Sequence, residues 1–173
     1  MQGGTQLGYA PLRHVLQERM AQLDIVTQAD QIVLTTGVTH ALDLVVRTLV
    51  RPGEPVMTFD PCWFGTHGLL ASHGARVLGV PCGADGPDFA AMEQLAQRER
   101  PRLLVVSSAA HNPTGLCLSA QQAGRILKVA AQFDMQIFED DVYADLCTSK
   151  VTRLAAALRE ARRTVARTSR RLP

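Results

Sequence analysis

Apolar residues occur along this chain in short runs that alternate with longer amphipathic stretches. Short runs of branched apolar side chains are typical of strands buried on both faces of a parallel sheet, and apolar residues three or four positions apart predict helices. The expected strands cover residues 32–35, 55–59, 76–80 and 103–106 and the region around Ile137; the expected helices cover residues 12–23, 39–50, 63–72, 88–98 and 119–133. This alternation predicts an α/β fold, a three-layer sandwich around a mostly parallel central sheet.

Polar residues stand where two of these strands end. The run at 103–106 is followed by HNPTG at residues 111–115, in which the proline favours an extended Asn112 and the glycine permits an immediate turn. A second strand runs into Asp140, and Tyr143 follows three residues later. Ligands bind at the carboxyl ends of the strands in open α/β sheets, so these three side chains are candidate site residues. Asn-Pro and Thr-Gly are also ordinary turn dipeptides.

Two further segments carry candidate chemistry. TTGVT at residues 35–39 places a glycine turn before a helix, which offers backbone N–H groups and a threonine hydroxyl to an anion such as phosphate. It is neither a Walker loop nor a GxGxxG fingerprint, and a helix simply capped by threonine is the alternative. Trp63, the only tryptophan, follows a strand-ending DPC turn. Its indole is placed either to stack on a flat heterocycle or to pack beneath a loop.

The consecutive carboxylates Glu139, Asp140 and Asp141 allow two interpretations. They form a hard-metal site, or one of them works alone beside two solvated neighbours. Side chains alternate along a strand, which sends Asp140 to the side opposite the other two and weakens a three-carboxylate cage. The five histidines show no metal-ligand spacing, so we expect no metal site.

Composition and charge limit the classes of protein to which this chain can belong. The 173 residues, 46% hydrophobic and 20% charged, suit one globular domain, and no apolar run approaches a membrane span. The opening residues lack a secretory signal and the four cysteines lack CxxC spacing, so we expect a cytoplasmic protein with reduced thiols. Residues 1–150 hold 11 Lys and Arg against 15 Asp and Glu, whereas residues 151–173 hold seven Arg against one Glu.

Four motifs in this order resemble one family. They are TTGVTHAL, DPCW, HNPTG and EDDVY, and the earlier GYAPLR also fits. Together they resemble the large domain of fold type I pyridoxal-phosphate (PLP) enzymes, the class I and II aminotransferases, over about residues 7–147. Within that family the chain is most similar to 2-aminoadipate-like aminotransferases and to the aminotransferase-like half of MocR-type regulators.

The resemblance implies a role for each candidate residue. Val38 and Thr39 would hold the phosphate of pyridoxal 5'-phosphate, and Trp63 would lie against the pyridine ring. Asn112 and Tyr143 would donate hydrogen bonds to the phenolic oxygen of the ring. Asp140 would pair with the pyridine nitrogen and keep it protonated.

The family's reaction needs a Schiff-base lysine, and the likeness breaks at this point. The chain has only Lys128, expected to face solvent in the middle of a helix, and Lys150, which follows Tyr143 too closely for the family's lysine. We therefore expect residues 1–150 to be a partial PLP-binding large domain without that lysine. Residues 151–173 are expected to be an aberrant or truncated tail. The alternative is a genuine basic helix that meets nucleic acid or an anionic surface.

Three functional hypotheses follow. The chain is part of an aminotransferase that exchanges an amino group between an amino acid and a 2-oxo acid, or it is the PLP-sensing effector part of a MocR-type transcription regulator. The third hypothesis is a non-catalytic fragment without a stable fold, because a sheet that lacks strands leaves edges uncovered. The resemblance implies a homodimer for a complete protein. It implies contact with nucleic acid only through a fused DNA-binding domain.

Overall fold

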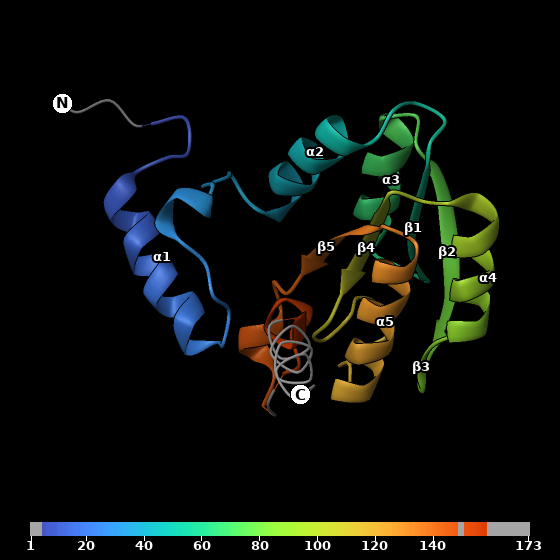
Figure 1. Cartoon of the computed structure of the whole chain (residues 1–173). Coiled ribbons are helices and arrows are strands. Elements are labelled where there is room, and N and C mark those ends of the chain that lie inside the picture. The colour runs from blue at the N-terminus through green and yellow to red at the C-terminus, as the bar shows by residue number, and fades with distance from the viewer. Residues whose placement is uncertain (1–4, 149–150, 159–173) are drawn as a thin grey trace, which may run out of the picture.

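The computed structural model describes residues 5–148 and 151–158, in which five strands form one sheet (Figure 1). The strands are β1 (Pro55–Asp60), β2 (Arg76–Gly83), β3 (Gly86–Pro87), β4 (Leu103–Ser107) and β5 (Gln136–Asp140). Their spatial order is β3-β2-β1-β4-β5. β3 pairs antiparallel with β2, and all other pairs are parallel. The predicted mostly parallel α/β sheet is thus confirmed.

Helices cover both faces of the sheet. The helices are α1 (Ala10–Gln22), α2 (Val38–Leu49), α3 (Phe64–Ser72), α4 (Phe89–Glu99) and α5 (Ala120–Gln132), with 3-10 turns η1 (Ala29–Gln31) and η2 (Ala144–Leu146). α2 and α3 pack on one face, where Val46 and Leu70 are fully buried. α4 and α5 pack on the other, where Met92 and Ile126 are fully buried. The three predicted layers are therefore present.

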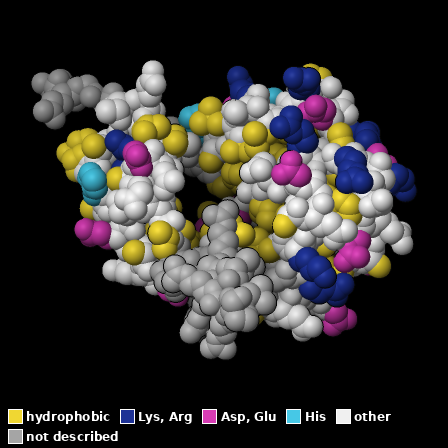
Figure 2. All heavy atoms as spheres, in the orientation of Figure 1, with side chains coloured by type: hydrophobic (Ala, Val, Ile, Leu, Met, Phe, Trp, Pro, Cys, Tyr) yellow, Lys and Arg dark blue, Asp and Glu magenta, His cyan; other side chains and the backbone are white. Residues whose placement is uncertain are grey.

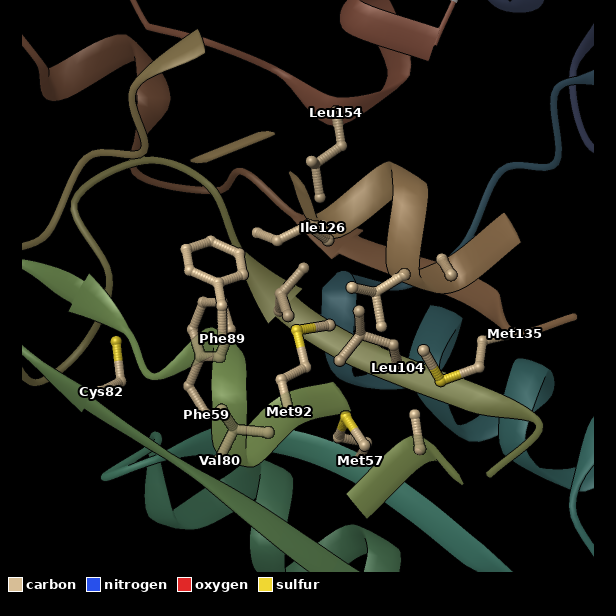
Figure 3. Close-up of a cluster of buried hydrophobic side chains, with 14 of the residues drawn as sticks. Met57, Phe59, Val80, Cys82, Phe89, Met92, Leu104, Ile126, Met135 and Leu154 are labelled. Atoms are coloured by element: carbon tan, nitrogen blue, oxygen red, sulfur yellow. The ribbon is translucent and has the colours of Figure 1, made fainter. Parts of the chain in front are cut away.

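Side chains alternate along the central strands, and this alternation divides the core in two. Met57 and Phe59 of β1 join the cluster under α4 and α5, whereas Val56 joins the cluster under α2 and α3. Leu104 and Leu103 of β4 divide in the same way. Figure 3 shows the first cluster, with side chains from β1, β2, β4, α4 and α5 meeting between the layers. A strand buried on both faces reads as a continuous apolar run, which is why these strands were predictable.

One predicted strand is wrong. Residues 32–35 are extended but belong to no strand of the described sheet. The Leu34 N–H donates to the Leu7 carbonyl, and the Leu34 side chain lies against Gly8. Val33 is 51% exposed. The apolar run favours an extended backbone, but a strand also needs a neighbour along its length. In the described chain, the bond from Leu34 to Leu7 is the only backbone hydrogen bond from residues 32–35 to a segment distant in the sequence.

The α1 segment lies at the end of the molecule away from β2 and β3 (Figure 1). Arg13 of α1 is buried and donates from Nη1 to the Ala29 carbonyl of η1 over 2.7 Å. Tyr9, Leu12 and Val15 are exposed by 65%, 45% and 60%, and Figure 2 shows hydrophobic side chains at the surface of this segment. The predicted helix is present, but its apolar face is largely uncovered. None of the described helices is both long and apolar enough to cross a membrane.

The chain re-enters the core after residue 150. Residues 154–158 are helical, and Leu154 is 2% exposed within the cluster under α4 and α5. The rest of the basic tail, residues 159–173, and Lys150 lie outside the described residues. The domain boundary at residue 150 and the nature of the tail stay predictions.

Candidate functional site

A pocket lies where β1, β4 and β5 end. Because these strands are parallel neighbours, their carboxyl ends and the loops that follow reach the same edge of the sheet. All six residues singled out from the sequence line this pocket: Val38, Thr39, Trp63, Asn112, Asp140 and Tyr143. Whether these residues hold a cofactor stays a prediction.

The first turn of α2 presents unpartnered backbone N–H groups to the pocket. The helix begins after Gly37, whose φ of 93° suits glycine. No side chain caps the helix, because its N-cap residue is Gly37, and the Thr35 hydroxyl donates to the Gly37 carbonyl. The N–H groups of Val38 and Thr39 therefore have no partner in the described chain, as expected at a helix N-terminus. The positive end of the helix dipole adds to the attraction for an anion.

Trp63 is the residue immediately before α3, and its ring lies against Gly65. A Cβ atom built on Gly65 would stand 2.3 Å from Cη2 of the indole, so only glycine permits this ring position. Phe64 is 81% exposed, and its ring centroid lies 5.4 Å from that of Trp63. The sequence placed Trp63 at this edge correctly, and its packing against Gly65 became visible only in the structure.

The loop that carries Asn112 is closed by backbone hydrogen bonds. The Gly115 N–H donates to the His111 carbonyl over 2.6 Å, and the His111 N–H donates to the Leu116 carbonyl over 2.9 Å. Gly115 has a φ of 70°, which confirms the turn expected there. These bonds hold the half-buried Asn112 at the pocket.

The three consecutive carboxylates separate as alternation predicts. Asp140 lines the pocket, and its Oδ1 accepts a hydrogen bond from the Val142 N–H over 3.0 Å. Glu139 turns away and accepts from the N–H groups of Leu154 and Ala155 over 2.7 and 3.0 Å. Asp141 pairs with Arg153 over 2.6 Å. They do not converge on a metal, and among the described residues no cluster of three His, Cys, Asp or Glu side chains does.

Asp140 is the one carboxylate of this group that lines the pocket, and it has no cation partner among the described residues. It is half-buried. A half-buried carboxylate gains most from a positively charged hydrogen-bond donor. The pocket thus offers an anion-binding helix end and a carboxylate suited to a protonated nitrogen.

Tyr143 follows β5 and begins the η2 turn. It is 40% exposed and lines the pocket at its rim. Arg19 of α1 forms an ion pair with Asp145 of η2 over 2.5 Å. The N-terminal segment therefore touches the loop that carries this tyrosine.

Several lining residues were not predicted from the sequence, among them Cys62, Gly65, Thr66, Ser107 and His111. His111 is 3% exposed, and its Nδ1 lies 2.8 Å from the Thr114 hydroxyl. Burial lowers the pKa of this imidazole, so the neutral ring is favoured at neutral pH. Its place inside the HNPTG motif was a signal, but spacing alone does not reveal burial.

Lys128 does not supply an amine to the described pocket, and Lys150 lies outside the described residues. Lys128 is exposed on α5, as predicted. None of the described lining residues is a lysine.

Comparison with known proteins gives a consistent assignment. The family model described as aminotransferase class I and II matches residues 2–169. The 2-aminoadipate transaminase of Thermus thermophilus is 34% identical over 139 residues, which are 80% of this chain and 34% of that enzyme. The uncharacterized HTH-type transcriptional regulator YjiR of Escherichia coli is 30% identical over 151 residues, 83% of this chain and 32% of the regulator.

A solved structure agrees with this fold. The crystal structure of LysN, the α-aminoadipate aminotransferase of Thermus thermophilus complexed with N-(5'-phosphopyridoxyl)-L-leucine, superposes with a TM-score of 0.83 at 32% identity. The likeness covers 93% of this chain and 40% of that one. The chain thus spans about a third of the length of the curated relatives named above.

Proposed function

This chain belongs to the class I and II aminotransferase family, and we propose that its pocket binds pyridoxal 5'-phosphate. The complete protein would use the cofactor to exchange an amino group between an amino acid and a 2-oxo acid. One observation carries the proposal: an uncapped helix N-terminus, an unpaired carboxylate and the sole tryptophan line the same pocket. These groups suit the phosphate, the pyridine nitrogen and the flat ring of one molecule.

The start of α2 fits the phosphate. Val38 and Thr39 would donate their backbone N–H groups, and the exposed Thr39 hydroxyl adds a third donor. Their N–H groups have no competing partner in the described chain, so binding would satisfy donors that now face water.

Asp140 fits the ring nitrogen. Its Oδ1 already accepts the Val142 N–H, which fixes the carboxylate in one orientation and leaves Oδ2 for a second donor. A carboxylate at that place would hold a proton on the nitrogen. When bound, the cofactor supplies an electron-accepting ring, and that capacity depends on the proton.

Three side chains would position the ring. Trp63 offers its indole face, and Gly65 fixes where that face lies. Asn112 and Tyr143 offer an amide N–H and a phenol O–H to an oxygen on the ring. They come from different loops, so binding would join the ends of β4 and β5.

The proton transfer of the family's reaction needs a lysine. Lys128 is exposed on α5, and Lys150 follows Tyr143 too closely in the sequence for the family's lysine. We therefore propose that this chain holds the cofactor reversibly and that its turnover is feeble.

For the complete protein we propose a homodimer. The exposed apolar face of α1 around Tyr9, Leu12 and Val15 supports it. A cytoplasmic location fits the four free thiols.

The relative YjiR supports a second candidate function, the effector part of a MocR-type regulator that senses PLP through the same pocket. Both candidates require cofactor binding, but only the aminotransferase converts a bound amino acid into a 2-oxo acid. Sequencing of the flanking DNA separates them. An upstream reading frame that encodes a helix-turn-helix favours the regulator, whereas a downstream lysine motif tests whether the chain is a truncated or frameshifted product.

The proposal is tested by recording the absorbance of the purified 173-residue protein during a PLP titration, before and after borohydride. If PLP binding is saturable and dialysis still removes the PLP after borohydride treatment, the result supports a pocket without the lysine. Permanent attachment to Lys150 would contradict the expected absence of the family's lysine. A spectrum that remains the sum of protein and free PLP would contradict cofactor binding itself.

A further inference from the structure

Two thiols meet outside the pocket. The Sγ atoms of Cys117 and Cys147 lie 3.8 Å apart although the residues are 30 positions apart in the chain. Cys117 is exposed and Cys147 is half-buried. We propose that this pair is a reversible dithiol–disulfide site that exchanges with small-molecule disulfides such as oxidised glutathione.

The geometry orients both sulfurs. Cys117 Sγ accepts a hydrogen bond from the Ala110 N–H over 3.3 Å, and the Cys147 thiol donates to the Tyr143 carbonyl over 3.6 Å. A disulfide bond is about 2.05 Å long, so the sulfurs must approach by roughly 1.8 Å. Cys117 lies in a surface loop and Cys147 follows the single turn η2, so neither sulfur is carried by a long helix or a central strand.

The exchange balances in two steps. The thiolate of one cysteine attacks a sulfur of the small disulfide, and the first small thiolate leaves. The thiolate of the second cysteine then attacks the protein sulfur of the mixed disulfide and expels the second small thiolate. Overall the two protein thiols lose two protons and two electrons, and the small disulfide takes them up and is reduced to two thiols. Burial and the neighbouring Cys117 raise the pKa of Cys147, so the exchange accelerates in mildly alkaline solution.

The other two cysteines are placed differently. Cys82 is 6% exposed in the core cluster under α4 and α5. Cys62 lines the pocket, and burial raises the pKa of its thiol. Within the described chain, Cys117 and Cys147 are the only two free thiols whose sulfur atoms contact each other. The disulfide is therefore specific to this pair.

The bond would tie together two loops that reach the pocket. Cys117 closes the loop that carries Asn112, and Cys147 closes the turn that begins at Tyr143. This consequence rests on the proposed function. Loops already fixed by the disulfide lose less conformational freedom when a ligand binds between them. Oxidation would therefore tighten PLP binding several-fold, and reduction would reverse the effect.

The site is tested on the reduced 173-residue protein, incubated with oxidised glutathione and examined by intact mass and peptide mapping. We expect the intact mass to decrease by two hydrogens and the peptide map to contain a linked Cys117–Cys147 peptide. Cys62 and Cys82 should still react with an alkylating reagent after unfolding, and a phosphine reductant should fully reverse the change. Cys117→Ser should instead keep a glutathione on Cys147, and Cys147→Ser one on Cys117. Glutathione adducts without the cross-link in the unsubstituted chain, or another cysteine pair, would overturn the proposal. Both of these outcomes are measured on the unsubstituted chain, so the test does not depend on whether the two variants fold.

The link to the pocket is tested after glutathione, whose amine reacts with PLP, has been removed. The oxidised protein should have a several-fold lower Kd for PLP than the reduced protein, and Cys117→Ser should show no such difference. An equal or higher Kd in the oxidised protein overturns the link. Absence of PLP binding in both forms contradicts the proposed function, while the disulfide mapping stands on its own.

Discussion

The indole of Trp63 occupies the space that a side chain on Gly65 would fill, with Cη2 2.3 Å from the position of a Cβ atom. The only tryptophan of the chain is therefore fixed at the pocket by a glycine two residues later. This glycine lies in the first turn of α3, where alanine would otherwise favour the helix.

Gly65→Ala should displace the indole and weaken PLP binding by roughly 2- to 10-fold, because aromatic contacts of this kind contribute about 0.5–1.5 kcal/mol. The matched control is Gly68→Ala in the same helix, where a Cβ atom meets nothing within 4 Å. Gly68→Ala should leave binding unchanged and stabilise the helix by about 0.5–1 kcal/mol. Equal Kd values for the two variants would show that the Trp63 ring position does not matter.

Asp140→Asn should weaken PLP binding by about 10- to 100-fold, because hydrogen bonds to charged groups contribute about 1.5–3 kcal/mol. The asparagine keeps an oxygen for the Val142 N–H, so the fold should be unaffected. The neighbouring Asp141→Asn is the control. Asp141 pairs with Arg153 on the other side of the strand, so its loss should lower stability and leave the Kd unchanged. Binding titrations of the two variants side by side decide which carboxylate serves the site.

Glu139→Ala should lower the free energy of unfolding by about 1–2 kcal/mol, the range found for helix N-caps. The Glu139 carboxylate accepts the N–H groups of Leu154 and Ala155, and so holds the turn that carries the buried Leu154. The exposed Glu93 of α4 provides the control, and Glu93→Ala should change stability by less than about 0.5 kcal/mol. Urea denaturation of both variants measures the difference. Equal midpoints would mean that residues 154–158 do not depend on Glu139.

His111 should make the fold sensitive to acid. Burial lowers its pKa in the folded state, so the unfolded chain binds this proton more readily. The contribution of the neutral His111 imidazole to the free energy of unfolding is therefore fully present above the usual histidine pKa of about 6.5. This contribution is lost as the pH decreases below that value. His111→Gln should flatten this part of the stability–pH curve, whereas His14→Gln at an exposed position of α1 serves as the control for losing one histidine. Denaturation series between neutral and mildly acidic pH measure both slopes, and parallel curves for His111→Gln and the unsubstituted chain would contradict the assignment.

Elements with a strong local signal were predictable from the sequence. Continuous apolar runs such as that at residues 103–106 predicted the buried strands, and alternation along the strand predicted that Asp140 points away from Glu139 and Asp141. These features depend on the spacing of apolar residues and on residues adjacent in the sequence, and both can be seen in the sequence itself.

Features that depend on distant partners were not predictable. Residues 32–35 have the composition of a strand, but no strand of the described chain pairs with them. Glu139 caps a helix 15 residues away, and Gly65 matters because of where the Trp63 ring lies. The burial of His111 likewise depends on the packing around it, including Phe59 of β1, whose ring centroid lies 5.6 Å from that of His111. Such contacts arise only when the chain folds.

The most direct measurement is the fluorescence of Trp63 during a PLP titration, because the chain has a single tryptophan and it lines the pocket. If PLP binds in this pocket, the quenching should saturate, and inorganic phosphate should compete with PLP and reduce it. In Asp140→Asn, half-maximal quenching should need a higher PLP concentration. Quenching that rises linearly without saturation, or saturates identically in Asp140→Asn, would contradict a PLP site in this pocket.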